Sequence, residues 1–144
     1  MARSDDLIVV DASAVLEFFT GAAPDEKLRR RILTTHAAAP ELLDVEIAHV
    51  LRRMAARGDI PDADAEEALR DITEAPIART PHRPLVQRIW ELRHAVTAYD
   101  AAYVALAEAL NVPLVTSDAK LAGSNGHDAV IELFPTSVRE RGRN

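Results

Sequence analysis

The hydrophobic residues of this chain form short continuous runs, separated by longer stretches in which they recur every three or four positions. The continuous run at residues 7–10 is typical of a strand buried on both faces of a parallel sheet. The runs predict strands at 7–10, 36–39, 77–80, 114–116 and 130–133. The spaced stretches predict helices at 12–19, 25–33, 40–58, 63–73, 84–93 and 97–110, with a short helix after 117–118. Strands that alternate with helices indicate a three-layer α/β/α sandwich around a central, mostly parallel sheet of four to five strands.

Proline, glycine and capping residues predict where individual helices begin and end. Pro40 suits the first turn of the longest helix, and Gly58 suits the position just after its end. Pro84 is expected to open a later helix, and Thr97 is a candidate cap for the one that follows it. No repeat, low-complexity segment or linker divides the chain. We therefore expect a single domain over residues 1–144, with a polar tail from about residue 136.

The composition is that of a soluble protein able to bury a core, with 48% hydrophobic and 28% charged residues. The chain has no cysteine, which excludes disulfides, thiol nucleophiles and cysteine-bound zinc. No apolar run reaches the roughly 18–20 residues that span a bilayer, and the first residues do not resemble a signal peptide, so we expect a cytoplasmic protein. A net charge of −6 argues against a protein that only coats nucleic acid, but not against a nuclease whose acids bind cations.

Two aspartates directly follow predicted strands. Asp11 comes after the run at 7–10, and Asp118 comes just after the run at 114–116. The carboxyl ends of strands are where open α/β sheets place their ligand sites. Either residue alone is equally well explained as a helix cap, because Asp is common between a strand and a helix.

Two further acids lie where predicted helices are apolar. Asp100 shares a helix face with Val96, Tyr103 and Val104, and a carboxylate buried there without a partner costs several kcal/mol. An aspartate in the first turn that is favoured by the helix dipole is the alternative explanation. Glu46 lies at the edge of the apolar stripe of the 40–58 helix, where a solvent-exposed boundary residue would also fit. If Asp11, Glu46, Asp100 and Asp118 converge, their like charges require compensation, and hard divalent cations bound by carboxylate oxygens supply it. None of the five histidines has the spacing of a zinc motif.

At these residues the sequence resembles a PIN domain, and within that family the VapC toxins of bacterial toxin–antitoxin pairs. The strand ending in Asp11-Ala12-Ser13-Ala14 matches the first family motif, and the segment from Pro40 to Glu46 matches the second. Tyr99-Asp100 and the alanine-rich helix after it match the third motif. Thr116-Ser117-Asp118 through Leu121 matches the fourth, so the motifs occur in the family order over residues 8–121.

The resemblance implies an endoribonuclease that uses Mg²⁺ or Mn²⁺ held by Asp11, Glu46, Asp100 and Asp118. It also implies an RNA substrate, a homodimer and a small VapB-like antitoxin that blocks the site. We expect Asp11, Asp100 and Asp118 to be the firmest ligands, whereas Glu46 either binds metal or positions the attacking water. The hydroxyls of Ser13 and Thr116 are expected to bond the carboxylates of Asp11 and Asp118, or to cap the backbone.

Other functions remain open at this point. A non-catalytic PIN-like scaffold that binds a protein or RNA partner would keep the fold but show no tight metal site. A phosphoacceptor receiver domain and a haloacid-type phosphatase both need a second acid that the layout around Asp11 lacks. The candidates for contacting RNA phosphates are Arg29–Arg31, Arg52, Arg53 and Lys120, although charged runs on helices are more often simply solvated. Trp90 is expected in the core or in a subunit interface, and Tyr99 and Tyr103 in either the core or the rim.

Overall fold

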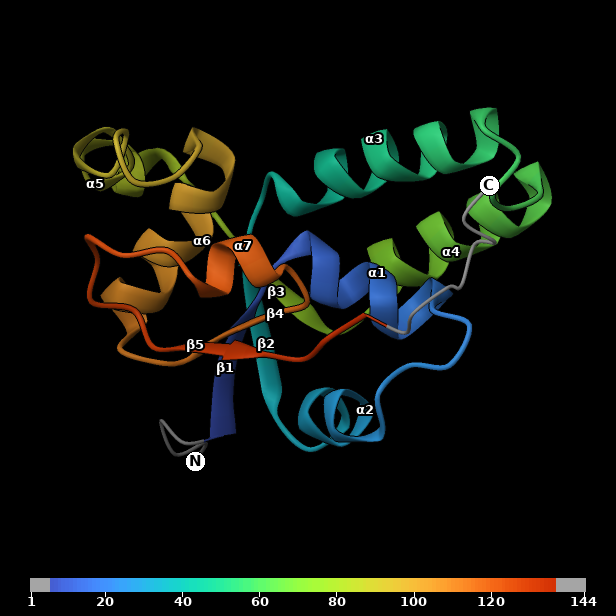
Figure 1. Ribbon diagram of the computed structural model, residues 1–144, viewed down its shortest axis with the longest axis horizontal. Coiled ribbons are helices and arrows are strands. Elements are labelled where there is room, and N and C mark those ends of the chain that lie inside the picture. The colour runs from blue at the N-terminus through green and yellow to red at the C-terminus, as the bar shows by residue number, and fades with distance from the viewer. Residues whose placement is uncertain (1–5, 137–144) are drawn as a thin grey trace.

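A computed structural model describes residues 6–136 of the chain. Its strands are β1 (Leu7–Val10), β2 (His36–Pro40), β3 (Ile77–Thr80), β4 (Leu114–Thr116) and β5 (Ile131–Leu133). Its helices are α1 (Ala12–Thr20), α2 (Glu26–Leu33), α3 (Leu43–Ala56), α4 (Asp62–Glu74), η2 (Arg83–Leu85), α5 (Val86–Glu91), α6 (Ala98–Leu110) and α7 (Ala119–Ala122). The five strands form one parallel sheet in the order β3-β2-β1-β4-β5. In Figure 1, α5 and α6 lie on one side of the sheet, and α1, α2 and α4 lie on the other. The α/β sandwich predicted from the sequence is therefore confirmed.

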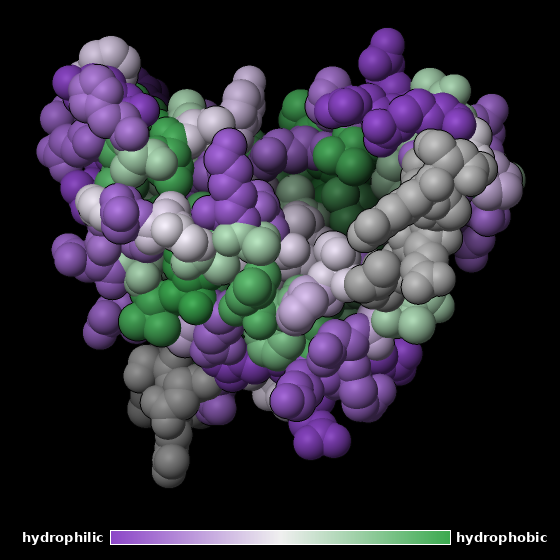
Figure 2. All heavy atoms as spheres, viewed as in Figure 1, coloured by the Kyte–Doolittle hydropathy of each residue, from purple (hydrophilic) through white to green (hydrophobic). Residues whose placement is uncertain are grey.

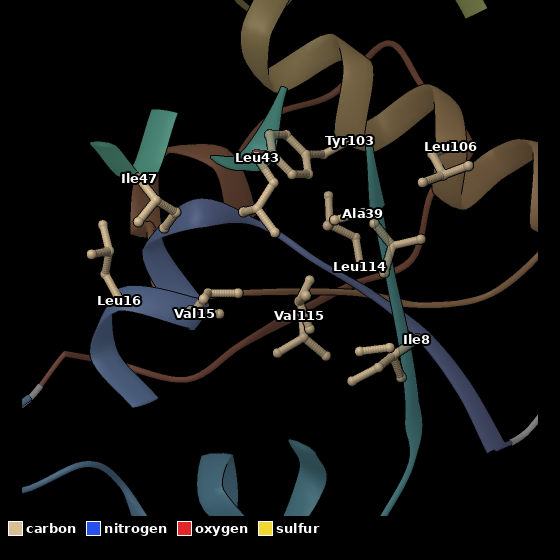
Figure 3. Packing of buried hydrophobic residues seen from close by; sticks show 14 of the residues in the cluster. Ile8, Val15, Leu16, Ala39, Leu43, Ile47, Tyr103, Leu106, Leu114 and Val115 are labelled. Carbon is tan, nitrogen blue, oxygen red and sulfur yellow. The ribbon is translucent and has the colours of Figure 1, made fainter. Parts of the chain in front are cut away.

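The core lies on both faces of the central strands. Ile8, Val9 and Val10 are at most 1% exposed, as expected for a strand covered by helices on both sides. Seven consecutive residues of α6, from Ala101 to Ala107, are buried, because this helix packs against β1, β2 and β4 and is covered by α5. Figure 3 shows side chains from α1, α3, α6 and the strands meeting in this cluster. Within residues 6–136, no helix is both long and apolar enough to cross a membrane.

The sheet topology brings distant parts of the sequence to one edge. Strands β1 and β4 are adjacent and parallel, with Val10 opposite Val115, so both end at the same edge of the sheet. The N–H of Asp11 donates to the carbonyl of Val115 at 3.2 Å, which holds the two strand ends together just beyond the ladder. The helices that follow, α1 and α7, both begin at this edge.

The structure corrects two of the predicted boundaries. Pro40 does not open the long helix; it is the last residue of β2, paired with Thr80 of β3, and α3 begins at Leu43. The chain needs a two-residue turn to leave the sheet before it can enter a helix. The helix predicted over 84–93 is shorter: Pro84 lies in the 3₁₀ turn η2, and α5 ends at Glu91. The polar tail predicted from about residue 136 lies almost wholly outside the described residues.

Candidate metal centre

Asp11 is the most deeply buried of the four predicted acids, with 4% of its surface exposed. It caps α1: its Oδ1 accepts hydrogen bonds from the Ala14 N–H at 2.9 Å and from the Ser13 hydroxyl at 2.7 Å. Its Oδ2 accepts a bond from the Thr116 hydroxyl at 2.5 Å. Burial nevertheless dominates, and it raises the pKa of Asp11 from 3.8 to about 6, with a small contribution from the negative charge of Asp100.

The hydroxyls of Ser13 and Thr116 join the two strand ends. The Ser13 hydroxyl accepts a bond from the N–H of Ser117 at 2.9 Å, and the Thr116 hydroxyl accepts one from the N–H of Asp118 at 3.0 Å. Both hydroxyls therefore bond the Asp11 carboxylate, but neither is bonded to the Asp118 carboxylate. That carboxylate instead caps α7, with its Oδ1 accepting from the N–H of Lys120 at 2.9 Å.

Asp100 lies in the first turn of α6, three residues after the capping residue Thr97, and is half-buried. Burial is the main reason that its pKa is raised, and the negative charge of Asp118 raises it further. The N–H of Asp100 bonds the Thr97 hydroxyl, and Lys120 lies close enough to lower the Asp100 pKa in opposition to those two effects. No other cation contributes to the shift.

Glu46 lies in the first turn of α3 and is also half-buried. Its pKa is raised, first by burial and then by the charges of Asp100 and Asp11, while a hydrogen bond from Tyr103 lowers it. The electrostatic effects connect these acids in pairs: Asp11 and Glu46 each interact with Asp100 and with one another, and Asp118 interacts with Asp100.

The arrangement suits a cation that is partly hydrated. Within residues 6–136, no set of three or more acids and histidines already converges on a single binding point. Mg²⁺ usually keeps several waters and takes only one or two carboxylates directly, so acids that flank a gap fit it better than a closed cage of side chains would. An all-oxygen donor set also favours Mg²⁺ or Mn²⁺ over zinc.

Tyr103 is a member of the site that the sequence left undecided between core and rim. It is 1% exposed, and its hydroxyl donates to Glu46 Oε1 at 2.6 Å. Figure 3 shows the Tyr103 ring extending from α6 toward Leu43, at the start of α3. Its pKa is raised by burial and by the nearby charge of Glu46, so the hydroxyl keeps its proton and acts as a donor. The available sequence signal was its spacing, since it lies three residues after Asp100 on the same helix.

The surface is hollowed at this edge of the molecule. Figure 2 shows the depression between α3 and the side formed by α5, α6 and α7. One groove of about 380 Å³ lies beside Glu46 and is lined by Val45, His49, Val50 and Tyr99. Tyr99 is 64% exposed and belongs to this rim rather than to the core.

The cations proposed for RNA lie in different places. Arg29 and Arg30 are exposed on α2, which lies toward the amino ends of β1 and β2 and away from the acids (Figure 1), and Arg31 pairs with Glu132. Lys120, in contrast, lies beside Asp100. Trp90 is 62% exposed and so does not lie in the core, whereas its alternative place in a subunit interface stays a prediction. The Arg93 guanidinium lies over its ring, 4.5 Å from the centroid.

Comparison with known proteins gives close relatives. The chain is 42% identical over 130 residues to Ribonuclease VapC1 of Mycobacterium tuberculosis, covering 89% of this chain and 98% of the relative. It is 39% identical over 127 residues to Ribonuclease VapC12 of the same organism, covering 88% and 98%. A third relative, VapC ribonuclease Mb0985 of Mycobacterium bovis, is 42% identical over 129 residues, covering 90% and 99%.

Solved structures share the fold at lower sequence identity. PAE2754 from Pyrobaculum aerophilum superposes with a TM-score of 0.66 at 24% identity, covering 90% of this chain and 85% of the other. VapBC2 from Rickettsia felis, solved with a DNA fragment from its promoter, gives a TM-score of 0.62 at 12% identity, covering 89% and 98%. The PIN domain family model matches residues 8–123, a stretch that contains all four acids. The chain therefore belongs to the PIN domain family, in its VapC branch.

Proposed function

We propose that this chain is a metal-dependent endoribonuclease and the toxin of a toxin–antitoxin pair. The observation that carries the proposal is the gathering of four acids beside an open depression, three of them with raised pKa values. Like charges held this close destabilise the fold unless a cation compensates them, so the arrangement is explained by function rather than by stability. Relatives at about 40% identity that carry the name ribonuclease support the same activity.

Asp11, Asp100 and Asp118 would hold Mg²⁺ or Mn²⁺, directly or through water. The bound ion supplies positive charge to a phosphodiester and makes a nearby water more acidic. Asp11 is the best fixed of the three, because the Ser13 and Thr116 hydroxyls and the Ala14 N–H hold both of its oxygens. Fixed ligands need no rearrangement when the ion or the substrate arrives.

Glu46 would either complete the cation site or orient the attacking water. Its Oε1 is occupied by the Tyr103 hydroxyl, and its Oε2 has no hydrogen bond within the described part of the chain. One oxygen is thus anchored while the other is available to a ligand or to a water. The raised pKa of Glu46 makes this oxygen a better proton acceptor than an ordinary solvated glutamate.

The proposed partners are an RNA substrate, a second copy of this chain and a small VapB-like antitoxin that covers the depression. VapBC2 of Rickettsia felis, which shares the fold, is named for such a pair. A non-catalytic scaffold is the alternative, and it would have no reason to keep four mutually repelling acids near one another.

The test is cleavage of total RNA by purified protein with Mg²⁺ or Mn²⁺, with EDTA as the control and with mapping of the new 5′ ends. We expect discrete cleavage sites that disappear in EDTA. Asp11→Asn and Asp100→Asn should each lose about a hundredfold or more in rate, as expected when a fixed charge that stabilises the transition state is removed. Asp71→Asn, an exposed acid on α4, is the matched control and should cleave like the parent.

Calorimetric titration with Mn²⁺ separates the enzyme from the scaffold. An enzyme should bind Mn²⁺ with an affinity that falls in Asp11→Asn and not in Asp71→Asn. Near-parental cleavage by either site variant, or the absence of any Mn²⁺ binding by the parent, would contradict the proposal.

A further inference from the structure

A second groove opens from the acid centre on the side away from α3. It has a volume of about 570 Å³, within the range of small-ligand sites, and it lies between the α5–α6 connection and α7 with the turn that follows it. Asp100 is one of its lining residues, so the groove is continuous with the candidate metal centre. Apart from Asp100, none of the residues that line this groove has a role in the reaction proposed above.

The groove carries the opposite charge to the centre it adjoins. Arg93, His94 and Lys120 line it, and Asp100 is the one acid among its lining residues. Thr97 and Asn125 add a hydroxyl and an amide. Cations and hydrogen-bond donors beside an anionic, cation-binding centre would suit the phosphates that neighbour a scissile phosphate held at the metal.

The two main cations of the groove are available to a ligand. Within residues 6–136 neither Arg93 nor Lys120 forms an ion pair with an acid. Several other arginines are already engaged: Arg88 pairs with Glu108, and Arg79 pairs with Asp44. The lack of an ion pair does not by itself indicate a binding site. Arg93 and Lys120, however, also line the same groove as Asp100 of the candidate metal centre.

Arg93 is held in place before any ligand arrives. Its guanidinium lies 4.5 Å from the centroid of the exposed Trp90 ring, and one of its terminal nitrogens donates to the Trp90 carbonyl at 3.0 Å. A guanidinium has five N–H donors, so most remain available for a phosphate. Because the side chain is already ordered, less conformational entropy is lost on binding.

Contacts outside the groove tie together the elements that carry it. Glu108 of α6 accepts two hydrogen bonds from Arg88 of α5, and it accepts a third from the N–H of Asp128 in the segment after α7. A Cβ added at Gly126 would lie 3.4 Å from the Ala95 side chain, which shows how closely this segment approaches the α5–α6 connection. These contacts hold the segments on the two sides of the groove against one another.

We infer that this groove binds the phosphate backbone of single-stranded RNA next to the cleaved bond, with Arg93 and Lys120 each contacting a phosphate. The inference rests on the proposed function and adds to it the path of the strand on the Asp100 side. An acidic protein segment would also be attracted by these cations, and it is the outcome to be distinguished. RNA is favoured because the groove adjoins Asp100 of the centre at which the proposed reaction needs a phosphodiester, so a strand in the groove would continue to the cleaved bond.

The experiment measures RNA binding without cleavage. The Asp11→Asn protein, in Mg²⁺, is titrated against a fluorescein-labelled single-stranded RNA of about twelve nucleotides, within the usual range of strand-binding sites. Affinity is measured by fluorescence anisotropy between about 50 and 200 mM salt. Arg93→Gln and Lys120→Gln are added singly and together. Arg70→Gln, an exposed arginine on α4 without an ion pair in the described chain, is the matched control.

We expect each groove substitution to weaken binding roughly tenfold and to reduce the slope of log affinity against log salt by about 0.7, the value for one phosphate contact on a single strand. The double substitution should reduce the slope by about 1.4, and the control should change neither quantity. Equal slopes for the parent, the groove variants and the control would overturn the inference. So would unchanged RNA binding combined with a loss of affinity for an oligoglutamate peptide, because that result assigns the groove to an acidic protein partner.

Different results would contradict the groove assignment and the ribonuclease assignment. If the otherwise unaltered Arg93→Gln/Lys120→Gln protein cleaves RNA with the parental KM and kcat while metal-dependent cleavage by the parent is clear, only the groove assignment falls. If the parent neither binds nor cleaves RNA in Mg²⁺ or Mn²⁺, the ribonuclease assignment falls with it. Arg70, Arg93 and Lys120 are at exposed positions, so substitutions there should leave thermal unfolding unchanged relative to the protein in which they are made, and this measurement verifies that the variants are folded.

Discussion

Asp11 combines the greatest burial with the largest number of fixed hydrogen bonds among the four acids, and its protonation is therefore linked to stability. Its pKa is raised to about 6 in the folded protein, so between pH 4 and 6 the folded state holds this proton more tightly than the unfolded state does. Stability due to Asp11 is fully present below the unfolded pKa and is lost as the pH rises through about 6. The shift corresponds to about 3 kcal/mol.

We predict that Asp11→Asn makes the metal-free protein more stable than the parent at pH 7 but not at pH 4, because the amide cannot ionise. Urea unfolding in EDTA across this range measures the difference in the free energy of unfolding. Comparison of variant with parent cancels the titration of groups that do not interact with Asp11, such as Glu108, whose pKa is lowered by Arg88. A difference that stays constant from pH 4 to 7 would show that Asp11 titrates normally.

Tyr103 acts on the site through Glu46. We predict that Tyr103→Phe lowers kcat by about tenfold, equivalent to the roughly 1.4 kcal/mol expected when one well-placed hydrogen bond to a charged group is removed. KM for RNA should change little, since the hydroxyl is buried against Glu46 rather than exposed to the substrate.

Tyr99→Phe is the matched control, because it removes an exposed hydroxyl from the same helix. It should behave like the parent in steady-state cleavage assays. Equal kcat values for Tyr103→Phe and Tyr99→Phe would mean that the Tyr103 hydroxyl has no part in positioning Glu46.

At the scale of elements, the start of α3 is anchored to the edge of the sheet by Arg79. This residue of β3 bonds both oxygens of Asp44 at 2.9 and 3.1 Å. It also donates to the carbonyls of Ile72, Ala75 and Ile77. A single guanidinium therefore connects α3, the end of α4 and β3. Its contact on α3, Asp44, lies two residues before Glu46.

We predict that Arg79→Met lowers the free energy of unfolding by about 2–4 kcal/mol, because Asp44 and three carbonyls lose a common donor in a partly buried place. Cleavage should also slow, since the turn of α3 that carries Glu46 loses its anchor. Denaturant unfolding and single-turnover cleavage measure the two effects. Arg83→Met, at an exposed position in η2, should change neither; a fully active Arg79→Met protein would show that α3 is positioned by packing alone.

At the scale of the whole molecule, one cluster of buried residues joins every layer, from Ile8 of β1 to Leu121 of α7. We predict a single cooperative unfolding transition, with equal calorimetric and van't Hoff enthalpies. Mn²⁺ should raise the transition temperature, because it binds the folded state and relieves the repulsion among the acids; at a hundred times its Kd it contributes about 2.7 kcal/mol. A separate early transition would indicate more than one folding unit, and no shift with Mn²⁺ would contradict a metal site.

The sequence by itself determined the fold class and the order of strands and helices, and it predicted the four acids as a group. These features are local: a buried strand, a helical stripe or an Asp at a strand end is visible within a few neighbouring residues. Asp100 was selected because a carboxylate within an apolar helix face is costly without a partner. The resemblance to the family motifs then predicted that all four acids share one site.

Only the tertiary structure decided which groups hold these acids and where the groove beside Asp100 lies. The Tyr103–Glu46 bond joins residues 57 apart in sequence, and the Thr116–Asp11 bond joins residues 105 apart. The groove between Arg93 and Lys120 likewise forms only when α7 and the turn after it approach the α5–α6 connection. Such contacts depend on how the layers pack, and no periodicity or local spacing along one chain encodes the distance between side chains on different elements.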